Sequence, residues 1–205
     1  MILGLDTATA ATAAAVLGDG VEREARDDPA AGARPNHATR LLALVEEVVA
    51  GDWDAVERIA VGLGPGGFTG LRHGIATARA LAQARALPLV GVSSLEALAA
   101  GEPVYAVIDA RRGEVFAYAE GKLEPQAIKP ADLAARLVPG DRAVGDGAVR
   151  FREEFERVGA DVPPGDSPVH RVSALQVCRL GAAGDPAGRD ALVPDYRRDP
   201  DAQPR

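Results

Sequence analysis

The sequence predicts an α/β protein of two lobes, each opening with paired strands and continuing with alternating helices and strands. Two strand–turn–strand patterns support this class. The first spans residues 2–25 around the turn Gly18-Asp19-Gly20, and the second spans residues 104–118 around Arg111-Arg112-Gly113. After each pattern, apolar residues recur at helical spacing, with short apolar runs between them. The same order of elements therefore occurs twice.

The chain has 205 residues, which is enough for one large domain or two lobes of about 100 residues each. Gly101-Glu102-Pro103 interrupts the pattern of elements, so we expect a first lobe at 1–101 and a shorter second lobe at 102–205. Residues 199–205 contain two prolines and no apolar run, and we expect them to fray.

In the first lobe, strand propensity and helical periodicity define eight elements. They are strands at 2–6, 12–17 and 21–25, a helix at 37–50, a strand at 59–63, a helix at 69–85, a strand at 89–92 and a short helix at 94–98. In the second lobe we expect strands at 104–108 and 115–118, a helix at 130–137, a strand at 142–144, and helices at 148–158 and 173–180.

Composition limits the function classes. The net charge of −7 disfavours tight, autonomous RNA binding, which depends on neutralising phosphates. The single cysteine, Cys178, excludes an intrachain disulfide, and its apolar helical neighbours predict a buried packing role rather than a nucleophile. Asp6 interrupts the first apolar run, and no segment is long and apolar enough for a membrane span, so we expect a cytoplasmic protein.

The glycine-rich loop at residues 62–70, GLGPGGFTG, lies between an expected strand and an expected helix. Gly62, Gly64 and Gly67 match the spacing of a dinucleotide fingerprint, but the next strand does not end in the acidic residue that this site requires. The loop also has the glycine spacing of a P-loop, yet Phe68 replaces the lysine that would meet phosphate charge. The residues favour a tight turn that lets the following helix pack closely.

The helix at 69–85 carries small residues every four positions: Gly70, Gly74, Ala78 and Ala82. Such a stripe lets another element approach closely, and it most often lies in the core of the same chain. Here two helices with apolar faces accompany a three-stranded meander. One face of so narrow a sheet does not obviously cover both helices, so we expect part of these faces to contact a partner.

Four segments resemble the TsaB family and occur in that family's order. They are LDTAT at 5–9, NHATRLLALVEE at 36–47, GLGPGGFTGLRHGIATARALAQARALPLVGVSSLEALA at 62–99 and IDARRGEVFAY at 108–118. The resemblance implies two actin-like lobes, each a mixed sheet with flanking helices. It also implies a non-catalytic scaffold for the synthesis of threonylcarbamoyladenosine in tRNA, with no cofactor of its own.

The partners implied by this resemblance are a TsaD-like homologue, bound through helices of the first lobe, and a TsaE-like ATPase. Self-pairing of the isolated chain and indirect contact with tRNA are also implied. The expected partner surface comprises His37, Leu41, Val45, Val48, Leu71, Gly74, Ile75, Ala78 and Ala82. On this basis, Ala78→Leu is expected to disrupt pairing while leaving the lobe folded.

The residues argue against a metal or nucleotide site. TsaD-like proteins bind a metal with two histidines on the first helix, but Leu41 follows His37 by four residues here. Asp6 and Thr7 remain candidates for nucleotide contact in the first turn, whereas Arg111 and Arg112 occupy the second turn. Two rival functions stay open, a nucleotide-binding regulator and a glycoprotease-like peptidase.

Overall fold

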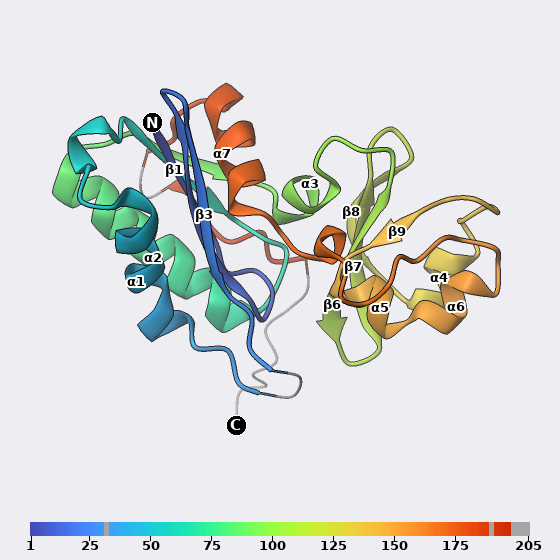
Figure 1. The fold of residues 1–205 in the computed structure, drawn as a ribbon. Coiled ribbons are helices and arrows are strands. Elements are labelled where there is room, and N and C mark those ends of the chain that lie inside the picture. Colours follow the sequence, from blue (N-terminus) through green and yellow to red (C-terminus); the bar gives the residue numbers. More distant parts are fainter. Residues whose placement is uncertain (31–32, 189–190, 198–205) are drawn as a thin grey trace.

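The computed structural model describes residues 1–30, 33–188 and 191–197 and consists of two lobes side by side (Figure 1). The predicted α/β class and the duplicated arrangement are confirmed, because each lobe contains a mixed sheet with flanking helices. Among the described residues, no helix combines the length and the hydropathy that crossing a membrane requires. The expected fraying of 199–205 concerns residues outside the described ranges.

The first lobe is built on a sheet with the strand order β3-β2-β1-β4-β5. The strands are β1 (Ile2–Asp6), β2 (Thr12–Gly18), β3 (Val21–Asp27), β4 (Arg58–Gly62) and β5 (Leu89–Val92). The first three strands form the predicted antiparallel meander, and β4 and β5 extend it in parallel with β1. The carboxyl ends of β1, β4 and β5 therefore meet at one edge of the sheet.

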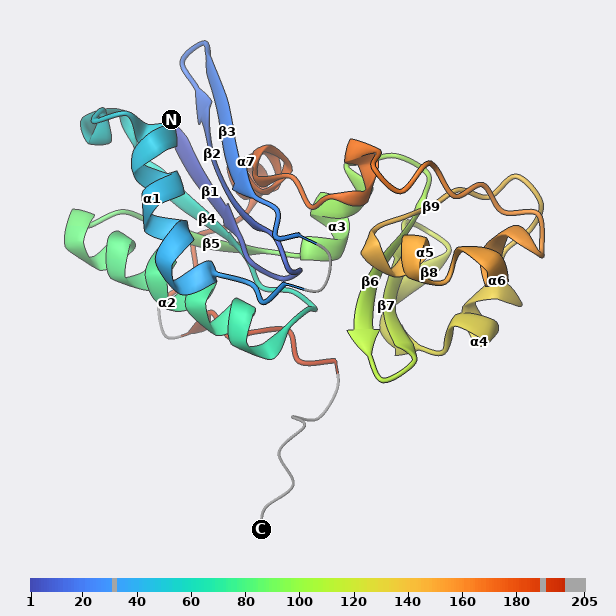
Figure 2. The ribbon, with the colours of Figure 1, turned by 60° about the horizontal axis from the view of Figure 1, so that its bottom comes forward.

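Helices cover both faces of this sheet (Figure 2). On one face, α1 (His37–Val49) and α2 (Phe68–Arg85) pack on the alternate side chains that include Leu3 and Leu5. On the other face, α7 (Ala174–Ala183) packs against Gly4 and the neighbouring alanines of β2. A Cβ atom on Gly4 would overlap backbone and side-chain atoms of α7, so this glycine allows the close approach.

Cys178 of α7 has the packing role that the sequence predicts. Its side chain is buried against the sheet, with Sγ within 3.4 Å of the Ile2 carbonyl oxygen. Burial raises the pKa of the thiol to about 12, so it stays protonated at neutral pH.

The second lobe is built on a sheet with the order β8-β7-β6-β9. Its strands are β6 (Tyr105–Arg111), β7 (Glu114–Ala119), β8 (Leu123–Ile128) and β9 (Ala143–Val144). The short helices α4 (Pro130–Ala134), α5 (Asp146–Arg150) and α6 (Arg152–Glu156) lie on one face, and α3 (Ser94–Ala99) lies on the other. Two single 3₁₀ turns, η1 (Trp53–Ala55) and η2 (Pro168–His170), complete the fold.

Two details of the second lobe differ from the predictions. The helix expected at 148–158 is divided into α5 and α6 at Phe151, which leaves the helical conformation with φ −109°. β8 was not predicted because Pro125 interrupts its apolar pattern. A proline is tolerated there because β8 is an edge strand, where a missing N–H need not break a ladder.

The division into lobes at 1–101 and 102–205 needs a correction. α7 and Leu192 belong to the second segment by sequence, but they pack in the first lobe. α1 and α2 cover one face of the first sheet, and the opposite face of β1, β2 and β4 is also apolar. α7, which follows the second sheet in the sequence, packs on that opposite face. α3 and α7 also share a continuous apolar core with β6, which joins the two lobes.

Candidate functional site

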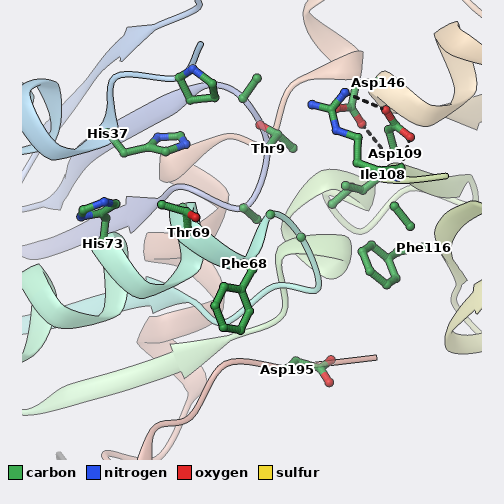
Figure 3. A pocket seen from close by; sticks show the side chains of 18 of the residues that line it. Thr9, His37, Phe68, Thr69, His73, Ile108, Asp109, Phe116, Asp146 and Asp195 are labelled. Carbon is green, nitrogen blue, oxygen red and sulfur yellow. Dashed lines mark hydrogen bonds and ion pairs between the residues drawn. The ribbon is translucent and has the colours of Figure 1, made fainter. Parts of the chain in front are cut away.

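A cleft of about 670 Å³ lies between the lobes, where the loops after β1 and β4 face the β6–β7 hairpin (Figure 3). The first lobe contributes the loop after β1, the start of α1 and the start of α2. The second lobe contributes the hairpin and the first residue of α5, and the C-terminal segment forms a further wall. The lining comprises residues 8–10, 34–38, 66–70, 73, 108–111, 116, 146 and 195–197.

Asp6, a candidate for nucleotide contact, does not line this cleft. Its carboxylate accepts hydrogen bonds from the backbone N–H of Ala8 at 2.9 Å and from the hydroxyl of Ser94 at 2.6 Å. Burial raises the pKa of this carboxyl group above its usual value. Gly62 faces it on the neighbouring strand, where a side chain would overlap the carboxylate. Asp6 therefore ties the end of β1 to α3, beside the end of β4.

Thr7, the second candidate, is also enclosed. Its side chain is fully buried, and its hydroxyl donates to the carbonyl oxygen of Gly70 at 2.8 Å. A Cβ atom on Gly70 or Gly74 would overlap atoms of Thr7. The small residues at the start of the α2 stripe thus serve close packing of α2 on the turn after β1.

All nine residues predicted to contact a partner are instead buried within the chain. They are His37, Leu41, Val45, Val48, Leu71, Gly74, Ile75, Ala78 and Ala82. The prediction is wrong because it assumed that the helices pack on a sheet of only three strands. Since β4 and β5 join the same sheet, its face is wide enough for both α1 and α2. Ala78, completely inaccessible, accordingly belongs to the core.

Two histidines that are distant in sequence meet at the cleft (Figure 3). His37 is nine-tenths buried, and its Nδ1 lies 2.8 Å from the hydroxyl oxygen of Thr12. Burial, and then the nearby His73, lowers the pKa of His37 below its usual value. No local sequence pattern indicates this proximity, because the two residues belong to different helices. Within the described ranges, no cluster of three or more His, Cys, Asp or Glu side chains could hold a metal ion.

The wall from the second lobe is an ion-paired cluster. The carboxylate of Asp109 lies 2.7 Å from Nη1 of Arg150 and 3.2 Å from Nη1 of Arg111. The backbone N–H of Asp109 donates to Oδ1 of Asp146 at 2.9 Å, and burial raises the pKa of Asp146. Asp146 was missed by sequence reasoning. Its position two residues after β9 could have identified it, because Asp6 and Asp109 also lie at strand ends.

The hairpin turn next to this cluster consists of Arg111, Arg112 and Gly113. Arg111 and Arg112 both adopt left-handed backbone conformations, with φ of 64° and 52°. Asp109 accepts a hydrogen bond from the backbone N–H of Arg111 at 2.9 Å, which fixes the start of the turn. The strand-end role that the sequence favours for Asp109 is therefore confirmed.

Helix dipoles, rather than side-chain charges, favour an anion in the cleft. The N-termini of α1 and α2 both open into it, and neither helix has an acidic residue in its first turn. The formal charges of the lining side chains balance, because the cleft contains Arg34, Arg111 and Arg197 together with Asp109, Asp146 and Asp195. The carboxylates of Asp109 and Asp195 are paired with arginines. Phe68, the first residue of α2, occupies the position where a P-loop has lysine.

Comparison with known proteins gives consistent matches. The family model described as TsaD, tRNA N6-adenosine threonylcarbamoyltransferase, matches residues 29–151. The tRNA threonylcarbamoyladenosine biosynthesis protein TsaB of Bacillus subtilis is 32% identical, over 80% of this chain and 81% of that protein. TsaB of Escherichia coli is 37% identical, over 56% of this chain and 52% of its own length.

Two further comparisons cover almost the whole chain. An uncharacterized protein of Mycobacterium tuberculosis is 37% identical, over 99% of this chain and 94% of its own. The solved structure of YeaZ from Pseudomonas aeruginosa superposes with a TM-score of 0.74 at 28% identity, covering 95% of this chain and 98% of that one. A second solved structure, described as similar to the peptidase YeaZ of that organism, has a TM-score of 0.75. These superpositions support the actin-like, two-lobed fold.

Proposed function

Because the chain belongs to the TsaB family, we propose that it acts in the synthesis of threonylcarbamoyladenosine in tRNA as a non-catalytic subunit. In this proposal the first lobe pairs with a TsaD-like transferase and supports recruitment of a TsaE-like ATPase. The observation that carries the proposal is the exposed face of the α1–α2 pair, which offers small and apolar side chains beside a cleft whose carboxylates Asp109 and Asp195 are ion-paired with arginines.

The non-catalytic part rests on the burial or engagement of the side chains that could act in catalysis. Asp6 and Thr7 are buried and bonded within the chain, so neither presents an oxygen to a ligand. Asp109 is held between Arg150 and Arg111, which leaves it poorly placed to act as a general base. Cys178 is a buried thiol with a pKa of about 12, the opposite of an activated nucleophile.

The partner surface is now assigned to the outer face of α1 and α2, defined by Ala38, Leu42, Ala76 and Ala80. All four side chains are exposed, and Leu42 remains 51% accessible. The two helices lie against each other on the same side of the sheet (Figure 2). Small residues around one exposed leucine form a surface on which a partner helix could pack closely.

Copurification with TsaD tests this assignment. Leu42→Asp should abolish copurification without lowering the thermal midpoint of the isolated chain, because the side chain is exposed. Ala43→Asp is the matched control, since it adds the same charge on the same helix about 100° away from Leu42. Unimpaired pairing of Leu42→Asp, or equal loss in both variants, would contradict the proposed face.

Reconstitution of tRNA modification with purified TsaD and TsaE tests the role itself. Modification should require this chain and should be lost with Leu42→Asp. The chain alone should bind tRNA weakly and with strong salt dependence, because its net charge is −7. Sub-micromolar binding of tRNA at physiological salt without partners would show instead that it recognises RNA directly. Gel filtration of the isolated Leu42→Asp variant reports whether self-pairing uses the same face.

A nucleotide-binding regulator is the second candidate, and the two helix N-termini that open into the cleft are the observation that favours it. We expect ATP turnover no faster than a buffer control, because Phe68 replaces the P-loop lysine and the acidic side chains are engaged. Calorimetry with ATP and ADP separates the candidates. Binding that Arg111→Ala weakens would support the regulator, whereas turnover abolished by Asp6→Ala would refute the non-catalytic role. The peptidase alternative is less favoured, because the Thr12 hydroxyl that contacts His37 is fully buried and cannot reach a substrate.

A further inference from the structure

The C-terminal segment Leu192 to Arg197, called the clasp below, runs from the first lobe to the second along one side of the cleft (Figures 1 and 2). Asp195, Tyr196 and Arg197 are cleft-lining residues, and Asp195 is visible at the edge of the pocket in Figure 3. The segment follows α7, so it crosses back after the chain has completed both sheets.

The clasp is fixed firmly on the first lobe. Leu192 is only 5% exposed and belongs to the core under α1 and α2. Arg79 of α2 donates a hydrogen bond to the carbonyl oxygen of Leu192. The backbone N–H of Asp195 donates to the carbonyl oxygen of Leu63 at 2.8 Å, which binds the clasp to the end of β4. Buried apolar contact and backbone hydrogen bonds make this end stable.

Tyr196 continues this attachment with a partly exposed cluster at the start of α2. Its ring stacks on Phe68 with 5.2 Å between the centroids, and its hydroxyl accepts a hydrogen bond from Nε of Arg72 at 3.2 Å. The guanidinium of Arg72 lies 3.8 Å from the centroid of Phe68. The three side chains hold the clasp beside the cleft.

Among the described residues, the clasp is attached to the second lobe by a much smaller contact than to the first. Nη1 of Arg197 donates to the carbonyl oxygen of Pro125 at 3.0 Å, while Nε of Arg197 pairs with Asp195. Pro125 lies where β8 departs from regular pairing with β7, between the residue pairs Ala117–Gln126 and Ala119–Leu123. Arg197 is 41% exposed, so water competes directly for this bond.

The lobes are joined firmly elsewhere. The shared core contains residues of β5, α3, β6 and α7, and its members Ile108 and Phe116 also line the cleft. The cleft thus has a fixed junction at the shared core and a wall that is attached strongly to one lobe and weakly to the other. Such an asymmetric attachment can open at low cost without unfolding either lobe.

We propose that the clasp is a releasable strap between the lobes, anchored on the first lobe and held to the second by Arg197, which sets the width of the cleft. This inference goes beyond the proposed function, because it concerns the motion of the chain itself. Tyr196 orients the strap, and Arg197 is the group that releases.

Double electron–electron resonance, which measures the distance between two spin labels, tests whether the clasp sets the separation of the lobes. Labels attached to Gln83→Cys in α2 and Asp132→Cys in α4 report the separation of the lobes, since both positions are exposed. The native Cys178 is buried and does not compete for the label. In the otherwise unaltered chain the distance distribution should be narrow. Arg197→Ala should shift it to a different mean and broaden it, and adding Tyr196→Ala should broaden it further.

Val193→Ala is the matched control, because Val193 lies within the clasp but is 62% exposed. It should give the unaltered distribution. Tyr196→Phe keeps the stacked ring and should also stay narrow. Thermal midpoints close to that of the parent chain show that both lobes remain folded. If the double variant unfolds, Arg197→Ala alone still decides, since it removes only an exposed side chain. Distributions identical in Arg197→Ala and Val193→Ala would overturn the proposal.

Discussion

Replacing Gly74 by alanine should destabilise the isolated chain, even though alanine is the better helix former. The added Cβ would overlap the hydroxyl oxygen of Thr7, which is fully buried and donates to Gly70 at 2.8 Å. Either α2 must move away from the turn after β1 or the hydroxyl must rotate and lose its acceptor. Both responses disturb the contact that brings α2 against the first sheet.

The expected magnitude follows from three opposing contributions. Overpacking of a core costs about 1 to 3 kcal/mol, and loss of the hydrogen bond costs about 1 kcal/mol. The greater helix propensity of alanine returns about 1 kcal/mol. The free energy of unfolding should therefore fall by about 1 to 3 kcal/mol, measured by urea denaturation of the chain without partners.

A double-mutant cycle with Thr7→Ala separates this contact from other effects. Removing the hydroxyl makes room for the new methyl group, so Gly74→Ala should cost much less in the Thr7→Ala background than in the parent chain. Additive effects, or a parent chain that gains stability from Gly74→Ala, would refute the reasoning. Unchanged stability together with lost copurification of TsaD would restore the original assignment of this stripe to a partner surface.

Three further outcomes test the same structure. Ala78→Leu should lower the free energy of unfolding by about 1 to 3 kcal/mol, because Ala78 is completely buried, whereas Ala76→Leu at an exposed position of α2 should leave it nearly unchanged in urea titrations. Cys178 should resist alkylation at pH 8 in the folded chain and react once urea unfolds it, and rapid labelling of folded protein would contradict its burial. Burial lowers the pKa of His37 below 6.5, so the unfolded chain takes up a proton first. Stability should fall as the pH drops from 6.5 to the lowered pKa, and His37→Gln should flatten that fall.

Local patterns in the sequence predicted most of the elements. Apolar spacing predicts α1 and α2 to within one residue at each end, and turns that contain glycine predict the β2–β3 and β6–β7 hairpins. These features depend on neighbours within a few positions, which the sequence displays directly. β8 was missed because an edge strand tolerates Pro125, whose lack of an N–H excludes it from an inner strand.

The candidate site was predicted only in part. Sequence spacing placed Asp6 and Asp109 at strand ends, and the structure confirms both as turn-forming residues. It did not show that His37 and His73 meet at the cleft, nor that Asp146 joins Asp109. These pairs come from different elements, and their approach depends on how α1, α2 and α5 pack on their sheets.

Periodicity identifies which face of a helix is apolar, but it does not say what covers that face. The small-residue pattern through Gly74 and Ala78 is the same whether the helix packs on a sheet of its own chain or on a helix of another chain. Only the tertiary structure decided between these, because the parallel strands β4 and β5 widen the sheet until it covers both helices. The same dependence on long-range pairing returns α7 to the first lobe and carries Arg197 across to Pro125, 72 positions away along the chain.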